Sequence, residues 1–176
     1  MVKQNPKIIN SCRACNAKCC RGLAVVLTIP EALRLVDNAA MRPEEILEFS
    51  RNIDSRRTPH YPLLVKHEKG VDEWFIIIRR LGRNCIFLHD DYSCAIYHSR
   101  PFVCRLYPFE LDGRTIKKGA LCPISFVREE NMEPDAVKLK RDLLEHEVIA
   151  RKWCVERGKR GEKPDMARFK DYFSRE

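Results

Sequence analysis

The chain has 176 residues and a formal net charge of +8. This length is enough for one domain, residues 1–176, that buries a core of its own, so disulfides are not needed merely to hold the fold together. No run of 18 apolar residues occurs anywhere, which excludes a membrane-spanning helix and predicts a soluble, cytoplasmic protein without a membrane partner.

Basic residues are densest in residues 151–170, where eight lysines and arginines face three acidic residues. Clustered basic residues bind phosphate through counterion release, so this segment raises a nucleic-acid hypothesis. A solvated face at the end of a terminal helix explains the same residues more simply, and we favour that interpretation for a basic tail over residues 159–176. Nucleic acid is therefore the less favoured partner.

Residues 24–29 are apolar and β-branched, which predicts a strand. Thr28 and Glu31 have the spacing of a capping box and precede an apolar run over residues 32–36, so a helix is expected to begin there. Pro43 indicates the start of a second short helix, which is expected to continue to Phe49.

Residues 63–65 and 74–78 are two apolar segments separated by a Glu-Lys-Gly turn, which predicts a hairpin whose second strand runs toward Cys85. Asp112 and Gly113 indicate a tight turn in a further hairpin.

The last long element is a helix over residues 134–158, where apolar residues recur at helical spacing. Its core-facing stripe is predicted to consist of Ala136, Leu139, Leu143, Ala150, Trp153 and Cys154, and is expected to be widened by Val137, Leu144 and Val148. Together these elements predict an α+β fold. It is a small single domain with short strands and hairpins, several short helices and a longer C-terminal helix, organised around a cysteine-rich metal or cluster site.

Eight of the nine cysteines lie between residues 12 and 122, in two blocks. The first block is the run Cys12-x2-Cys15-x3-Cys19-Cys20, and the second contributes Cys85, Cys94, Cys104 and Cys122. Three fates are open to such thiols: disulfides, a bound metal or iron-sulfur cluster, or thiol redox chemistry. A Cys-x2-Cys turn places two sulfurs beside free backbone N–H groups, and the cytosol keeps thiols reduced, so we favour the metal or cluster.

The adjacent pair Cys19 and Cys20 constrains the number of metal centres. Neighbouring side chains in extended backbone point to opposite sides, so the two thiols are not expected to serve one metal ion comfortably. Two centres or one polynuclear cluster would resolve this, and eight thiols are enough for two four-sulfur sites. The order of the two spacings is the reverse of the radical-SAM motif, which excludes that enzyme class for this segment.

The second block contains the motifs Cys85-x-Phe-Leu, Cys94-x-Ile-Tyr and Arg100-Pro-x-x-Cys104-Arg-x-Tyr-Pro. With the first run and Cys122, this combination resembles the YkgJ-type cysteine-cluster family, whose members are described as zinc- or iron-chelating and are related to flagellin lysine N-methylases. The resemblance implies a metal-binding cysteine-cluster core over residues 12–122. In that family the first run is commonly Cys-x2-Cys-x2-Cys-Cys. The chain is one residue longer there, which leaves open whether Cys19 or Cys20 is a ligand.

Two arginines near these thiols have two interpretations. Arg100 and Arg105 either lower the thiolate pKa values and offset the charge of a cluster, or are ordinary surface arginines or pair with Asp90, Asp91 or Glu110.

The remaining side chains near the thiols are given structural roles. Tyr97 and Tyr107 are interpreted as core residues that border the site. His89 and His98 are close to the second block, but eight thiols are already available, so neither is required as a ligand. Cys154 lies on the apolar stripe of the last helix and is interpreted as a small buried hydrophobic residue.

The sequence therefore predicts a metal-binding protein that holds zinc or an iron-sulfur cluster through thiolates, as a binding, redox or metal-handling module with scope for a protein partner. The candidate ligands are Cys12, Cys15, Cys19, Cys20, Cys85, Cys94, Cys104 and Cys122. One alternative is a protein lysine N-methylase-like enzyme, although the chain has no Gly-x-Gly-x-x-Gly loop. The other is a metal-stapled nucleic-acid-binding protein. Thiolates suit zinc and iron equally, so the metal is left open.

Overall fold

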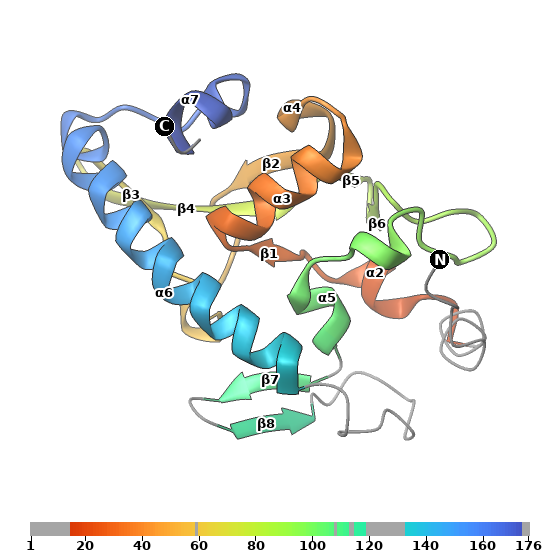
Figure 1. Ribbon diagram of the computed structural model, residues 1–176. Helices are drawn as coiled ribbons and strands as arrows, with labels where there is room; N and C mark the ends of the chain where they lie inside the picture. The colour runs from red at the N-terminus through yellow and green to blue at the C-terminus, as the bar shows by residue number, and fades with distance from the viewer. Residues whose placement is uncertain (1–14, 59, 108, 113–114, 119–132, 174–176) are drawn as a thin grey trace.

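The sheet of the protein is built around one long strand, β4 (Gly70–Ile78) (Figure 1). The computed structural model describes residues 15–58, 60–107, 109–112, 115–118 and 133–173. All three neighbours of β4 are antiparallel to it: β3 (Leu63–His67) pairs with its first half, while β1 (Val26–Leu27) and β2 (Leu47–Ser50) flank its second half. Because this second half is paired on both edges and covered, residues 75–78 are all buried.

The hairpin predicted from residues 63–65 and 74–78 is confirmed, and both of its strands are longer than the apolar segments alone. After β4 the chain forms a second hairpin of β5 (Arg80–Leu81) and β6 (Asn84–Cys85). Gly82 in its loop has a φ of 62°, which glycine adopts at little cost. One candidate ligand cysteine thus lies at the end of β6.

Helix α3 (Ile29–Ala39) lies across this sheet (Figure 1). Its predicted capping box is confirmed: the Thr28 hydroxyl accepts a hydrogen bond from the Glu31 N–H, and the Glu31 carboxylate accepts one from the Thr28 N–H. The helix buries Leu35 and Val36 in the core, as the spacing of its apolar residues predicts.

Two predicted element boundaries are wrong. The strand expected over residues 24–29 is limited to β1, because Thr28 caps α3 and Ile29 is already helical. The helix that begins at Pro43 ends as α4 (Pro43–Ile46), and the chain continues as β2 instead of remaining helical to Phe49. Pairing with β4 explains the difference, since hydrogen bonds to a central strand override a short helical pattern.

The predicted C-terminal helix is confirmed as α6 (Glu133–Glu156), which packs against α3, β3 and α5 (Phe102–Leu106). Its buried face includes Leu139, Ala150 and Trp153, as the apolar spacing predicts.

Val137, Leu144 and Val148 do not widen the buried face of α6. Their exposed fractions are 60%, 69% and 69%. At 100° per residue these three positions lie within about 40° of one another and opposite His146, which is buried. The prediction is wrong because α6 has apolar residues on two opposite faces. The face that contains Ala150 and Trp153 packs against the core, and the face that contains these three residues does not.

Short elements complete the chain. They are η1 (Ser55–Arg57), η2 (Tyr97–Ser99), the hairpin of β7 (Phe109–Asp112) and β8 (Thr115–Lys118), η4 (Gly158–Arg160), η5 (Met166–Arg168) and α7 (Phe169–Phe173). The turn predicted after Asp112 falls within the β7–β8 hairpin, and Gly113 lies outside the described residues. The architecture is the predicted α+β single domain with a longer C-terminal helix. No helix in the described parts of the chain is long and apolar enough to cross a bilayer.

Five of the eight basic residues in segment 151–170 have acidic partners. The pairs are Arg151 with Glu147, Lys152 with Glu156, Arg157 and Arg168 with Glu162, and Lys170 with Asp37. These carboxylates neutralise much of the local positive charge, which agrees with a solvated face more than with a phosphate-binding surface.

Two buried histidines join α6 to the rest of the core. His146 on α6 accepts a hydrogen bond at Nδ1 from the Ile29 N–H at 3.0 Å, and its Nε2 donates to the Tyr61 carbonyl at 2.7 Å. The ring of His60 lies edge-on to it, with 6.1 Å between centroids. Burial lowers the pKa of His60 to about 3 and also lowers the pKa of His146, so both rings are neutral at pH 7.

We predict that His60 makes the fold sensitive to acid. Its folded pKa of about 3 lies below the ordinary value of 6.5, so the unfolded chain takes up the proton first and stability is lost as the pH falls from 6.5 toward 3. Between pH 7 and pH 5 this loss is about 2 kcal/mol. Urea unfolding at both pH values should show a loss about 2 kcal/mol smaller in His60→Phe. An equal loss in both proteins would contradict the prediction.

Candidate metal centre

Five of the eight candidate ligand cysteines lie on neighbouring elements, close enough for their charges to interact, and we call them the five-cysteine group. They are Cys19 and Cys20 on helix α2 (Lys18–Gly22), Cys85 at the end of β6, Cys94 in the loop that follows, and Cys104 on α5. Figure 1 shows α2, β6 and α5 near one another, and α2 contacts β6. Each thiolate charge shifts the pKa of its neighbours: Cys104 responds to Cys85 and Cys94, and Cys20 to Cys85 and Cys104.

The other three candidate ligands are Cys12, Cys15 and Cys122. Cys15 lies in the turn before α2, and Cys12 and Cys122 lie outside the described residues. No member of the five-cysteine group forms a disulfide. The disulfide alternative therefore has no support at these five positions.

The helical backbone of α2 changes the prediction for the adjacent cysteines. Asn16 and Ala17 have φ values of 53° and 46°, and this left-handed turn leads directly into the helix. Neighbouring side chains on a helix diverge by about 100° instead of the 180° of a strand. Cys19 Sγ and Cys20 Sγ therefore lie 4.0 Å apart, and the premise that they face opposite ways is wrong. Two thiolates at about 2.3 Å from one tetrahedral ion would lie about 3.8 Å apart, so this spacing suits a shared ion.

Cys85 and Cys94 each begin a turn of the same form. The carbonyl of each cysteine accepts the N–H three residues later, at 3.0 Å for Cys85 and 3.2 Å for Cys94. The N–H two residues later, at Phe87 and at Ile96, donates to the cysteine sulfur. A hydrogen bond from the Ala95 N–H to the Phe87 carbonyl at 2.8 Å joins the two turns. Amide donors of this kind stabilise thiolates in zinc and iron-sulfur sites.

Burial raises the pKa of Cys85, Cys94 and Cys104, because a thiolate is poorly solvated there. In the adjacent pair, the Cys20 thiol donates to Cys19, which lowers the pKa of Cys19 to about 6 and raises the pKa of Cys20. Most thiols of the group are therefore protonated in the absence of a cation. A bound metal ion would replace those protons and stabilise the thiolates.

Arg80 and Arg100 supply positive charge to the sulfurs. Arg100 lowers the pKa of Cys94 and Cys104, and Arg80 lowers that of Cys85. Arg80 Nε is buried and has no hydrogen-bond partner in the described parts of the chain. A buried donor of this kind needs an acceptor, and a metal-bound thiolate or a cluster sulfide is a suitable one.

Arg105 is exposed, as the surface interpretation expects, but its acidic partner is none of the three that were named. Its Nε–H donates to Asp135 on α6 at 3.0 Å, so it connects α5 to α6. The acidic partner comes from a distant helix, which local sequence patterns do not identify.

Two histidines and a tyrosine also lie near the thiols, and none of the three is fully buried. His89 and His98 are exposed, and Tyr97 is partly buried against the guanidinium of Arg100. Cys154 is 9% exposed, and its Sγ accepts a hydrogen bond from the Leu64 N–H of β3 at 3.0 Å. The prediction that Cys154 is a small buried residue of the core is confirmed.

The fit of a metal depends on the chemistry of these donors. Within the described residues, no three His, Cys, Asp or Glu side chains stand at the spacing of a metal site. The five-cysteine group nevertheless supplies soft thiol ligands, amide donors to two of them and the charge of two arginines. Zinc and iron both suit such a set.

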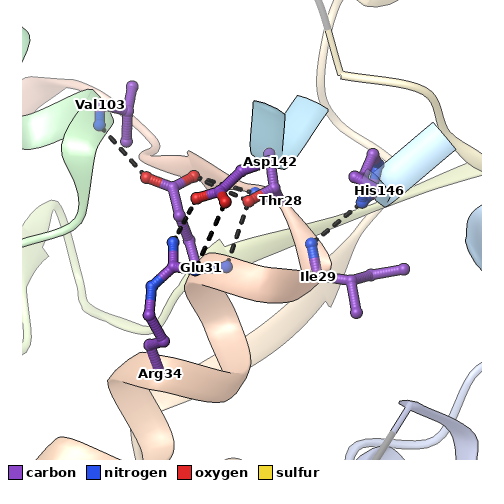
Figure 2. Close-up of polar contacts among 7 residues, drawn as sticks. All are labelled: Thr28, Ile29, Glu31, Arg34, Val103, Asp142 and His146. Carbon is purple, nitrogen blue, oxygen red and sulfur yellow. Dashed lines mark hydrogen bonds and ion pairs between the residues drawn. The ribbon is translucent and has the colours of Figure 1, made fainter. Parts of the chain in front are cut away.

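Glu31 has a role that its capping spacing did not indicate. Its side chain is buried, and the carboxylate accepts three hydrogen bonds (Figure 2): from the Thr28 N–H at 3.2 Å, the Thr28 hydroxyl at 3.0 Å and the Val103 N–H at 3.3 Å. Val103 precedes Cys104, so this carboxylate fixes a candidate ligand of α5 against the start of α3. Burial raises the pKa of Glu31. No local signal could reveal the contact, because Val103 is 72 positions away.

Two further contacts attach α6 to the start of α3. Together with the hydrogen bonds of Glu31 they form what we call the capping junction, which consists of Thr28, Ile29, Glu31, Arg34, Val103, Asp142 and His146. Arg34 of α3 pairs with Asp142 of α6, whose side chain is 1% exposed. The Ile29 N–H at the start of α3 donates to His146 (Figure 2). The capping junction therefore connects α3, α5 and α6 through buried polar groups.

Comparison with known proteins gave one match. The sequence model of the CxxCxxCC family, described as "Putative zinc- or iron-chelating domain", matches residues 11–131. The match covers about two thirds of the chain and includes all eight candidate ligand cysteines. It confirms the resemblance to a zinc- or iron-chelating cysteine-cluster family. No curated protein and no solved structure matched the chain.

We predict that Glu31→Ala lowers the free energy of unfolding by roughly 2–4 kcal/mol, because two N–H donors and one hydroxyl lose their acceptor in the core. Glu31→Gln should lose less, since its amide keeps an acceptor oxygen. Glu68→Ala, in an exposed turn, is the control and should change stability by less than about 0.5 kcal/mol. Denaturant titration of the three variants measures this. A Glu31→Ala protein as stable as the control would contradict the prediction.

Proposed function

Because the chain belongs to the CxxCxxCC family, we propose that it is a metal-binding cysteine-cluster protein that holds zinc or iron through cysteine thiolates. The observation that carries the proposal is the five-cysteine group. Its sulfurs come from two segments far apart in the sequence, Cys19–Cys20 on α2 and Cys85–Cys104 over the two turns and α5. Packing of a core does not require several thiols in one place. Metals that bind thiolates do require it.

The proposed ligands are the eight cysteines Cys12, Cys15, Cys19, Cys20, Cys85, Cys94, Cys104 and Cys122. The amides of Phe87 and Ile96 would hold two thiolates in place, and Arg80 and Arg100 would offset the negative charge that several thiolates leave on a divalent ion. The 4.0 Å spacing of Cys19 and Cys20 supports one ion or one polynuclear cluster between them.

We further propose a metal-handling or redox role for this centre. The members of the five-cysteine group are partly exposed. Partial exposure would let a partner protein deliver or remove metal or electrons. The acid-paired basic residues near the C-terminus lend the nucleic-acid alternative no support, and nothing in the described residues favours an N-methylase-like reaction.

Elemental analysis of protein purified without oxygen tests the metal proposal. We expect zinc or iron in stoichiometric amount, with visible absorption if the metal is an iron-sulfur cluster. Cys94→Ser should lose at least half of the metal, because one thiolate and its amide-supported turn are removed. Cys154→Ser is the matched control, since its sulfur bonds to β3, and it should retain the full amount.

Two outcomes would contradict the proposal. One is natural protein without zinc or iron, and the other is equal metal content in Cys94→Ser and Cys154→Ser. A chelation experiment adds an independent measurement: verified removal of the metal should lower the Tm, because an ion bound only to the folded state stabilises it.

A further inference from the structure

A pocket of about 390 Å³ lies between α3 and the segment that leads into α5. Its lining includes three arginines, Arg34, Arg100 and Arg105, and three apolar residues, Leu35, Pro101 and Phe102. Glu31, Asn38, His98 and Ser99 complete the wall. The volume is that of a site for a small organic molecule. None of the lining residues is a candidate metal ligand, so the pocket is a separate feature beside the five-cysteine group.

The guanidinium of Arg100 is held in a fixed orientation at this pocket. Its Nε–H donates to the Tyr97 carbonyl at 3.0 Å, and its central carbon lies 3.9 Å from the centroid of the Tyr97 ring. Within the described residues no carboxylate pairs with Arg100. A guanidinium fixed at Nε presents its two terminal nitrogens as a fork, which matches the two oxygens of a carboxylate or phosphate.

Further positive charge converges on Phe102. The guanidinium carbons of Arg34 and Arg105 lie 5.1 Å and 5.6 Å from the centroid of its ring, and Lys138 Nζ lies 5.6 Å from the same point. Carboxylates of α6 hold the two arginines in place. One aromatic ring in the pocket wall is thus surrounded by three cations.

Positive charge exceeds negative charge at the pocket. Arg34 and Arg105 each have one acidic partner, while Arg100 and Lys138 have none within the described parts of the chain. Glu31 also lines the pocket, but its carboxylate is buried and accepts three hydrogen bonds in the capping junction. An anion that enters therefore meets a net positive charge beside an apolar wall.

We propose that this pocket binds a small organic anion. Its carboxylate or phosphate group pairs with Arg100 and Arg105, and its apolar part lies against Phe102 and Pro101. An inorganic ion alone would leave the apolar wall and most of the volume unused. The anion would be held by arginines and apolar side chains and the proposed metal by cysteines, with Arg100 beside both.

Isothermal titration of the natural chain with benzoate, phenyl phosphate and inorganic phosphate tests this proposal. Benzoate and phenyl phosphate distinguish a carboxylate from a phosphate, and inorganic phosphate lacks the apolar part. We expect saturable binding of at least one organic anion, at least tenfold tighter than that of inorganic phosphate. Arg100→Gln and Arg105→Gln should each weaken this binding at least tenfold. Arg151→Gln, an exposed arginine of α6 paired with Glu147, is the control and should leave it unchanged.

Metal analysis of the same proteins separates the pocket from the metal centre. Cys94→Ser should bind the organic anion whether or not it retains metal, and Arg105→Gln should retain metal while it loses the anion. The proposal is overturned if neither organic anion binds saturably, if inorganic phosphate binds equally well, or if both arginine variants bind as the natural chain does. Should Arg100→Gln fail to fold, Arg105→Gln decides the result.

Discussion

The buried carboxylate of Glu31 connects the elements on which the rest of the structure depends. It caps α3 through Thr28 and accepts the N–H of Val103, so α5 is fixed against α3 at the residue before Cys104. The same end of α3 holds α6 through His146. A carboxylate is costly to bury, and three donors offset that cost only while all of the elements remain in place. The hydrogen bond between Val103 and Glu31 fixes the position of α5. Helix α5 in turn contributes Cys104 to the five-cysteine group and Phe102 and Arg105 to the pocket beside it.

The thiolates of the five-cysteine group are not given enough donors by the fold to offset their burial, whereas the Glu31 carboxylate accepts three hydrogen bonds. The thiols of this group are partly buried, and burial disfavours their thiolates, so the fold alone does not stabilise the charged ligands. Amide donors and two arginines lower that cost without removing it. Under the proposed function, a metal ion would supply the missing positive charge, and folding and metal binding would then depend on each other. Arg100 lies at the boundary of both sites, since it acts on the thiols and lines the pocket.

Features set by neighbouring residues could be predicted from the sequence. The capping box of Thr28 and Glu31, the hairpin of β3 and β4, and the length of α6 all depend on local spacing, and the structure confirms them. The motifs around Cys85 and Cys94 likewise indicated the metal-binding family, because each motif encodes one turn with its own amide donor.

Features decided by distant contacts could not be predicted. The chain from Leu47 forms a strand because β4 provides an antiparallel partner. Cys19 and Cys20 lie on a helix, with their sulfurs 4.0 Å apart, because a left-handed turn starts α2 beside them. The acidic partner of Arg105 and the acceptor for the Val103 N–H lie on other helices, and no local pattern identifies such pairs. The second apolar stripe of α6 shows the same limit, since spacing alone does not say which stripe meets the core.

X-ray absorption at the zinc or iron edge of protein purified without oxygen is the most direct measurement of the central claim. Thiolate ligation predicts a first shell of sulfur atoms at about 2.3 Å from the metal. A first shell dominated by nitrogen or oxygen at about 2.0–2.2 Å would contradict it, because the metal would then be held by residues other than the five-cysteine group.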